Sequence, residues 1–262
     1  HSHAPRLFLH LPQRDADRAT LAAATQVVLV DDELSTGNTF VNLVAALRRV
    51  MPALSRVHIA TIADFTGDRR SLLSERMGIP CSIGGLLRGA WRFEHRHDAG
   101  PETLLTTSAA QCSAGHEVQI EDAGYGRLGR TTCVSLPKGL VERLAGEPAE
   151  GATLVLGTGE FMHAAFALGR ALEARGVDVR VQSTTRSPIL LWGAVGHILA
   201  VPDPYGEAVQ NYLYNVRPGQ YARVLICHET APNDPLMQLA TILGARLIHF
   251  TSDDHAEEIP VC

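Results

Sequence analysis

The sequence has few cysteines, no excess of positive charge and no long apolar run. Its five cysteines among 262 residues are scattered and form no Cys-x-x-Cys pair, which argues against a disulfide framework or a zinc site and indicates the reduced thiols of a cytoplasmic protein. The formal net charge of −5 does not suggest a nucleic-acid or anionic-membrane partner. No stretch is long and apolar enough to span a membrane, and no secretory signal pattern is present.

The composition is that of a globular α/β protein. Hydrophobic residues make up 45% and charged residues 19% of the chain, both ordinary values for a folded domain, and the length suits two α/β domains or one large one. Residues 94–101 are charged, show no apolar period and end in Gly-Pro, which is typical of a linker. We therefore predict domains at residues 1–98 and 99–262.

The most informative segment of the first domain spans residues 27–39. Four apolar, β-forming residues precede Asp31 and Asp32, a small hydroxylated loop around Gly37 follows, and apolar residues then recur at helical spacing. This pattern predicts a buried strand that ends at the two acids, a tight turn and a helix start. A helix N-terminus binds anions, most often phosphate, and strand-end carboxylates accept hydrogen bonds from sugar hydroxyls.

Two other interpretations of this segment are weaker. A Walker-type phosphate loop needs a lysine before its Ser or Thr, and residues 33–39 contain none. A plain strand-to-helix turn needs a single capping acid and does not account for two acids followed by Thr-Gly-x-Thr.

The segment resembles the 5-phosphoribosyl-1-pyrophosphate (PRPP) signature of type I phosphoribosyltransferases. That signature is an apolar strand, two acids, three variable residues and Thr-Gly-x-Thr, and every position is filled here. The resemblance implies that Asp31 and Asp32 are catalytic residues, which hold the ribose hydroxyls and support positive charge on the ribosyl ring. It implies a 5′-phosphate clamp made of Ser35, Thr36, Gly37, Asn38 and Thr39. It also implies Mg²⁺ bound through PRPP, without a metal cage made by the protein.

In that family a pyrophosphate loop and most of the first domain precede the signature, whereas only 26 residues precede it here. We therefore expect a type I phosphoribosyltransferase-like parallel sheet that is truncated on its N-terminal side, with part of the active site outside this sequence. The family's mobile catalytic loop falls near His3 and Arg6. These residues either shield the pyrophosphate or belong to a tag remnant or a frayed end.

The remaining elements of the first domain follow from local pattern. Residues 13–25 favour a helix or turn, residues 57–63 alternate like a strand, and residues 69–77 can form a helix. A last strand-like segment begins at Cys81.

The second domain shows regular alternation of strands and helices. Short apolar segments predict strands over residues 154–156, 179–181, 198–201, 224–227 and 247–250. Helical stretches separate several of them, most clearly residues 164–175 and 235–243. This order indicates a doubly wound, Rossmann-like parallel sheet.

Each of these strands is followed by a polar or glycine-bearing motif, and ligands of such sheets bind at the carboxyl ends of the strands. Taken singly, each motif is also explained as a turn or helix cap. Taken together, they predict Glu160 as an acid or base and Arg186 as an anion clamp. The further ligand contacts predicted there are Thr185, Ser187, Asp203 and Glu229.

This half of the chain resembles the TRSP domain, which is named for the Thr-Arg-Ser-Pro run found here at residues 185–188. Residues 157–161, residues 203–206 and Asn215 agree with it. The resemblance implies a domain that follows a phosphoribosyltransferase domain in bacterial proteins of tellurite-resistance and stress gene clusters, but it names no chemistry. The segment 211–215 could stack a base, although core packing is the safer interpretation.

Together these features predict a pentosyltransferase that transfers ribose 5-phosphate from PRPP to a nitrogenous base and releases pyrophosphate. The companion domain would bind or process the nucleotide. Two alternatives stay open: a non-catalytic PRPP- or nucleotide-binding regulatory module, and reverse or hydrolytic release of a base from a nucleotide. The expected partners are small molecules, with a homodimer left open.

Overall fold

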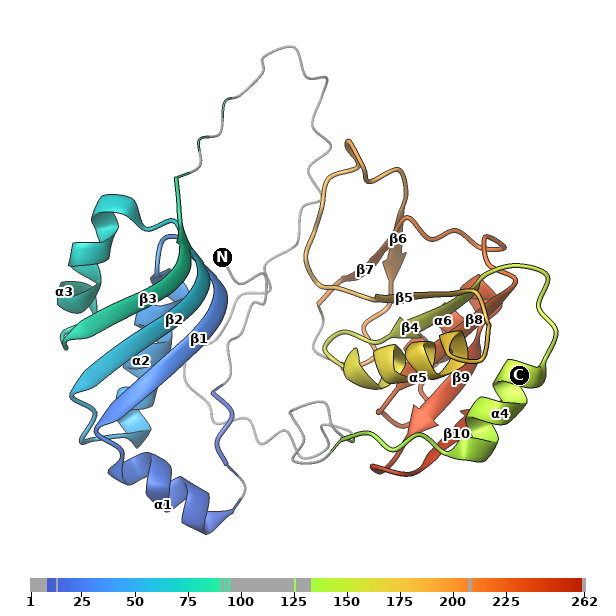
Figure 1. Ribbon diagram of the computed structural model, residues 1–262, viewed down its shortest axis with the longest axis horizontal. Coiled ribbons are helices and arrows are strands. Elements are labelled where there is room, and N and C mark those ends of the chain that lie inside the picture. Colours follow the sequence, from blue (N-terminus) through green and yellow to red (C-terminus); the bar gives the residue numbers. More distant parts are fainter. Residues whose placement is uncertain are drawn as a thin grey trace. The chain divides into compact units, whose positions relative to one another are not determined.

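The computed structural model describes residues 9–12, 14–90, 92, 94, 125, 133–206 and 209–260. The chain divides into two compact units between residues 100 and 101, each with its own sheet (Figure 1). The boundary predicted after residue 98 lies outside the described residues, as do His3 and Arg6.

The first unit is a three-stranded parallel sheet with helices. Its strands are β1 (Gln26–Leu34), β2 (Arg56–Asp64) and β3 (Cys81–Arg88), in the order β1-β2-β3. Its helices are α1 (Asp15–Ala23), α2 (Asn38–Val50), the 3-10 helix η1 (Gly67–Leu72) and α3 (Leu73–Met77). The predicted strands over residues 57–63 and from Cys81 are confirmed, and the helix predicted over residues 69–77 is divided between η1 and α3.

One face of this sheet packs against α2 and α3. Phe40 and Val44 of α2 join Leu29, Val57 and Ile59 of the strands in one apolar core. The strand periodicity of two therefore turns every second residue of β1 away from the core.

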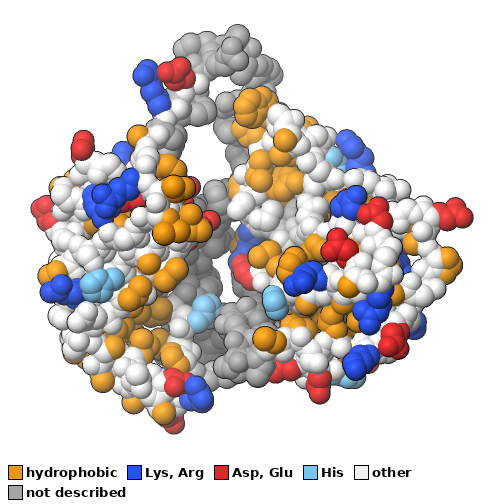
Figure 2. Space-filling view, viewed as in Figure 1, with side chains coloured by type: hydrophobic (Ala, Val, Ile, Leu, Met, Phe, Trp, Pro, Cys, Tyr) orange, Lys and Arg blue, Asp and Glu red, His pale blue; other side chains and the backbone are white. Residues whose placement is uncertain are grey.

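The opposite face of the sheet is open, so the prediction of a fully buried strand was wrong for half of β1. Val28 is 59% and Val30 is 78% exposed, and Ile62 of β2 and Leu86 of β3 are 55% and 83% exposed; hydrophobic side chains of this unit are visible at the surface in Figure 2. Parallel sheets are normally covered on both faces, which is why an apolar run predicts burial. The strand also continues past the two acids to Leu34, so Asp31 and Asp32 lie within it and do not end it.

The second unit contains three helices and seven strands in its described part. The helices are α4 (Lys138–Gly146), α5 (His163–Glu173) and α6 (Asp234–Leu243). The strands are β4 (Thr153–Gly157), β5 (Val179–Ser183), β6 (Ile198–Val201), β7 (Asn211–Tyr214), β8 (Arg223–His228), β9 (Arg246–Phe250) and β10 (Ala256–Ile259).

The main sheet of this unit has the order β10-β9-β8-β4-β5, in which only β10 is antiparallel to its neighbour. Four of the five predicted strands lie in it. The fifth strand, over residues 198–201, is confirmed as β6, but its expected place in the parallel sheet was wrong, because β6 forms a separate antiparallel pair with β7. Nine residues join β6 to β7, and an antiparallel pair tolerates such a short connection, whereas a parallel pair needs a longer crossover.

Both faces of the main sheet are covered. On one face Val155, Leu225 and Ile248 pack with residues of α4 and α5. On the other face the alternate strand residues pack with α6 and with the β6–β7 hairpin, so every residue of β4 is buried. The helix that follows β4 and the helix that follows β8 thus lie on opposite faces, and the chain diverges between these two neighbouring strands. Ligands of open parallel sheets bind at such a divergence, outside the carboxyl ends of the strands.

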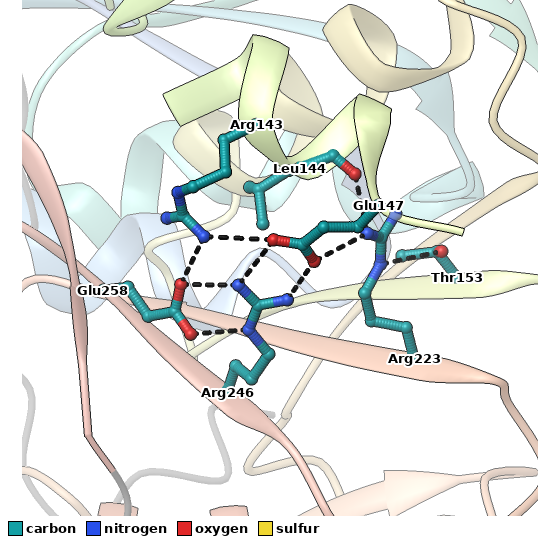
Figure 3. A network of polar contacts seen from close by, with 7 residues as sticks. All are labelled: Arg143, Leu144, Glu147, Thr153, Arg223, Arg246 and Glu258. Atoms are coloured by element: carbon teal, nitrogen blue, oxygen red, sulfur yellow. Dashed lines mark hydrogen bonds and ion pairs between the residues drawn. The ribbon is translucent and has the colours of Figure 1, made fainter. Parts of the chain in front are cut away.

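A network of charged side chains fastens α4 to the amino ends of the strands (Figure 3). Arg246 bridges Glu147 and Glu258, with its Nε 2.6 Å from Glu258 Oε1. Arg143 lies 2.8 Å from Glu258, and Arg223 donates to the carbonyl of Leu144 at 2.6 Å. These contacts lie at the edge of the sheet opposite the predicted ligand motifs. They stabilise the sheet, and the sheet in turn positions those motifs.

Among the described helices of the chain, none has the length and hydropathy needed to cross a membrane.

Candidate functional site

The two acids of the first unit are exposed side chains on β1. Neighbouring strand residues point to opposite faces, so Asp31 and Asp32 do not project in parallel. The Asp31 carboxylate accepts the backbone N–H of Asp32 at 3.0 Å. Thr61 of β2 donates its hydroxyl to the carbonyl of Asp32 at 2.9 Å and fixes the backbone there. Both carboxylates remain open to a ligand, from different sides of the strand.

Gly37 makes the turn between β1 and α2. Its φ of 73° lies in the left-handed region, which other residues rarely adopt. A Cβ on Gly37 would lie 2.5 Å from Cδ2 of the buried Leu73. The packing of Leu73 against the loop therefore requires a glycine at this position, whether or not a phosphate also approaches the backbone there.

The loop leads into α2 through Gly37, an N-cap residue without a side-chain cap bond, while the hydroxyl oxygen of Thr36 accepts the N–H of Asn38 at 3.4 Å. Of the predicted clamp residues, Ser35 and Thr36 are half-buried, and Asn38 and Thr39 are exposed. Free N–H groups at a helix start attract an anion. The geometry thus places the predicted hydroxyls and amide at the N-terminus of α2.

Arg76 of α3 also reaches this loop, and sequence reasoning missed it. Its guanidinium donates to the carbonyl of Thr36 at 2.9 Å and to Oδ1 of Asn38 at 2.5 Å. No local pattern links Arg76 to a loop 38 residues earlier, so only the tertiary structure shows the contact. It adds a cation to the loop that the signature assigns to phosphate.

Asp64 orders the neighbouring turn at the carboxyl end of β2. Its carboxylate accepts the N–H and hydroxyl of Thr66 at 3.0 and 2.6 Å and pairs with Arg70. Burial raises the pKa of Asp64, but the bonds from Thr66 and the charges of Arg70 and Arg88 outweigh it and hold the pKa below its ordinary value. Asp64 is therefore a structural carboxylate, ionised at neutral pH.

In the second unit, the motifs after β4 and β8 meet where the chain diverges. The hydroxyl of Thr158 lies 3.3 Å from Oε2 of Glu229. Tyr205 donates its hydroxyl to the carbonyl of Thr158 at 2.8 Å. Asp203 accepts the N–H of Tyr205 at 2.9 Å and so shapes the turn that carries this tyrosine. Asp203 and Glu229 are thus joined through Thr158 and Tyr205, and their contact with a ligand stays a prediction.

Arg186 pairs with Glu160 across the loops after β5 and β4. The side chains are 23% and 52% exposed, respectively, so the pair is open to solvent on the glutamate side. An anionic ligand at Arg186 has to compete with Glu160 for the guanidinium. The two residues predicted as clamp and acid or base are therefore direct partners in this structure.

The hydroxyls of the Thr-Arg-Ser-Pro region serve the backbone. Thr184 accepts the N–H of Gly159 at 2.8 Å, and Thr185 accepts the N–H of Ser187 at 3.1 Å. The first bond ties the loop after β5 to the loop after β4, and the second lies within the motif and orders its turn.

Strand β7 holds this motif in place through hydrogen bonds. Thr185 exchanges two backbone hydrogen bonds with Tyr212, at 2.9 and 2.7 Å. The hydroxyl of Tyr214 donates to the carbonyl of Ser187 at 2.7 Å and accepts the N–H of Ile189. Both tyrosines are buried, with ring centroids 6.0 Å apart, so this segment packs in the core, as its safer interpretation held.

Among the described residues, no three His, Cys, Asp or Glu side chains gather as a metal site. Cys81, Cys133 and Cys227 are free thiols.

Comparison with protein families assigns both regions. A family described as phosphoribosyl transferase matches residues 1–90, and the TRSP domain, described as C-terminal to it, matches residues 129–243. Searches of curated proteins and of solved structures gave no significant match. The chain therefore contains a region that matches the phosphoribosyl transferase family, followed by a region that matches the TRSP domain.

Proposed function

We propose that the first unit binds PRPP and transfers ribose 5-phosphate to a nitrogenous base with release of pyrophosphate. The observation that carries this proposal is the continuous path from the exposed pair Asp31 and Asp32, through the left-handed turn at Gly37, to the N-terminus of α2. One path of this kind offers carboxylates for a ribose diol and N–H groups for its 5′-phosphate.

In this proposal the charges of the substrate have separate partners. The start of α2, the hydroxyls of Ser35, Thr36 and Thr39, and the guanidinium of Arg76 hold the 5′-phosphate. Asp31 and Asp32 hold the ribose hydroxyls and stabilise the positive charge that develops on the ribosyl ring.

The same carboxylates fit Mg²⁺, which prefers oxygen ligands and keeps substrate phosphates in its shell. They are exposed on β1, so a metal that arrives with PRPP can reach them. When bound, Mg²⁺ would neutralise charge on the leaving pyrophosphate.

Calorimetric titration with PRPP tests the first unit. Changing Asp31→Asn and Asp32→Asn together should abolish measurable binding, because each lost charge-assisted hydrogen bond weakens binding by about 1.5–3 kcal/mol. Glu33→Gln is the matched control, since Glu33 is an exposed acid of the same strand outside the two-acid pair. Unchanged PRPP affinity in a folded double variant would contradict the assignment.

Turnover of labelled PRPP with a panel of bases decides whether the protein is an enzyme. Formation of a nucleotide and pyrophosphate supports the transferase. Binding without turnover supports the alternative of a PRPP or nucleotide sensor. Release of base from nucleoside monophosphates supports the reverse or hydrolytic reaction.

For the second unit we propose a Rossmann-like nucleotide-binding domain that receives the product of the first. Its support is the divergence of the chain between β4 and β8, where Thr158 meets Glu229. Here Glu160 is the candidate acid or base and Arg186 the anion clamp. The other proposed ligand contacts are Thr185, Ser187, Asp203 and Glu229.

Titration with nucleoside monophosphates tests the second unit, in a chain that also carries the Asp31→Asn and Asp32→Asn changes. Arg186→Ala should weaken binding of the monophosphate more than that of the nucleoside, because only the former has the anion. Arg180→Ala is the control, since Arg180 is exposed on β5 and pairs with Asp178, which directly precedes that strand. Equal losses for monophosphate and nucleoside would contradict an anion contact.

The family resemblance also supports a cytoplasmic role in tellurite-resistance and stress systems. PRPP and a base or nucleotide would be the partners.

A further inference from the structure

His228 ends β8 next to the divergence of the chain and is fully buried. Its ring stacks on that of His249 in the neighbouring strand, with centroids 4.9 Å apart and planes at 4°. Glu229 and Thr230 follow it directly. The segment thus runs from the sheet into the loop that meets Thr158.

The hydrogen bond of His228 determines its tautomer. Nδ1 lies 2.9 Å from the carbonyl oxygen of Thr230, and because a carbonyl only accepts, Nδ1 carries the proton. Burial lowers the pKa of His228, the Thr230 carbonyl raises it and the neighbouring His249 lowers it, which leaves a net value of about 4. The ring is therefore neutral at pH 7, and Nε2 presents a bare lone pair.

Two polar atoms of this segment lack a hydrogen-bond partner within the part of the chain that the structure describes. They are Nε2 of His228 and the hydroxyl oxygen of Thr230, and both are buried. A buried polar group without a partner costs about 1–3 kcal/mol, and native proteins contain few of them. Two within three residues, at the edge where parallel sheets bind ligands, indicate that a ligand completes the bonding.

The chemistry of these groups restricts the ligand. Nε2 of His228 only accepts a hydrogen bond, Glu229 beside it is a carboxylate, and the Thr230 hydroxyl can accept as well as donate. Such a set recognises a group with several N–H donors rather than a phosphate.

We propose that His228 and Thr230 read the donor edge of a nucleobase that carries an exocyclic amine. This inference rests on the proposed function of the second unit as a nucleotide-binding domain and names the part of the nucleotide that it recognises. An amine offers two N–H donors, one for Nε2 of His228 and one for the hydroxyl oxygen of Thr230. Uracil has a carbonyl at that position and would face the His228 lone pair with its own.

The test uses the full chain with Asp31→Asn and Asp32→Asn, so that binding to the first unit does not contribute. AMP, CMP and UMP are titrated by calorimetry, and the melting temperature is measured without ligand. AMP or CMP should bind at least tenfold more tightly than UMP. Thr230→Val should lower the affinity for the preferred nucleotide by about tenfold. It should leave the melting temperature of the free protein unchanged or raise it, because it removes an unsatisfied buried group.

Three further variants sharpen the result. Thr241→Val changes an exposed threonine of α6 that bonds only its own helix and should leave binding unchanged. His228→Leu should lose binding, whereas His228→Gln, whose amide oxygen can replace the Nε2 acceptor, should keep part of it.

The contrary outcomes are distinct. Wild-type affinity in Thr230→Val, or equal affinity for UMP and CMP, would overturn the base-reading assignment while leaving the anion contact at Arg186 intact. No nucleotide binding at all would overturn both proposals for the second unit. The first unit is judged separately, by PRPP binding and turnover.

Discussion

Gly37 shows how one residue serves both packing and the proposed chemistry. The signature explains a glycine here by the approach of a phosphate, but a Cβ would first meet Leu73 at 2.5 Å. Leu73 is fully buried in the core of the first unit. Loss of ligand binding in a Gly37 variant is therefore not evidence of phosphate contact by itself.

We predict that Gly37→Ala destabilises the first unit by about 2–5 kcal/mol, because the left-handed backbone costs an alanine about 1–2 kcal/mol and the overpacked contact with Leu73 costs about 1–3 kcal/mol. Urea unfolding of the variant measures this. Gly67→Ala is the matched control, because Gly67 also has a positive φ of 53°, but a Cβ added there would have no atom within 4 Å. Equal losses in both variants would show that the Leu73 contact has no energetic effect.

At the scale of elements, β7 matters because its residues are hydrogen-bonded to the Thr-Arg-Ser-Pro motif at residues 185–188. The hydroxyl of Tyr214 bonds the backbone at Ser187 and at Ile189, and its burial raises the pKa of the phenol. The motif is thus held by an element that the sequence did not reveal as a strand.

We predict that Tyr214→Phe loosens residues 185–191 and lowers stability by about 1–2 kcal/mol, because two backbone groups lose their partner. Hydrogen exchange of peptides covering Ser187 and Ile189 should become faster. Tyr221→Phe provides the comparison, since Tyr221 packs at the edge of the same unit's core. Unchanged exchange at Ser187 would mean that the phenol does not hold the motif.

Helix α4 depends on the charged network at the other end of the sheet. The hydrogen bond from Arg246 lowers the pKa of Glu147, and the charges of Arg246, Arg223 and Arg143 lower it further, against a raising effect of burial. A carboxylate whose pKa is lowered by folding stabilises the fold at pH values above 4.5, its pKa in the unfolded chain. This stabilisation is lost as the pH falls through the lower pKa of the folded state.

We predict that Glu147→Gln costs about 1–3 kcal/mol at pH 7, measured by urea unfolding of the second unit. The difference from the wild type should shrink as the pH falls below 4.5, because the wild-type carboxylate then becomes protonated too. Glu142→Gln on the exposed side of α4 should have little effect at either pH. A difference that grows in acid would contradict the sign of the shift.

The sequence was sufficient where a local pattern determined the structure. Residues 27–39 predicted a strand, a turn and a helix start because apolar period, glycine and helical spacing are all local. The extent of β1 and the exposure of Val30 were not predictable, since an apolar run does not show whether a second layer covers the sheet.

Contacts between distant segments were the least predictable part of the sites. Arg76 reaches the loop at Asn38 only through the packing of α3. The strand pattern of β6 was predictable, but its pairing with the four-residue β7 was not. The sequence places His228 in the polar motif after the strand predicted over residues 224–227, but its unpaired Nε2 is visible only once its neighbours within the described chain are placed.

At the scale of the whole molecule, each unit has its own core. One apolar cluster lies within the first unit, and the other two lie within the second. Units with separate cores usually unfold independently. The chain should therefore show two unfolding transitions, and a substitution should move only the transition of its own unit.

Hydrogen exchange followed by mass spectrometry during a urea titration tests this, because peptides report each unit separately. Gly37→Ala should lower the midpoint for peptides of β1 and α2 and leave those of β4 and β8 unchanged. Glu147→Gln should do the reverse. If either variant moved both sets of peptides together, the units would unfold as one cooperative body. Substitutions in one proposed site would then no longer leave the other intact, and the Asp31→Asn and Asp32→Asn chain could not serve as the background for nucleotide binding by the second unit.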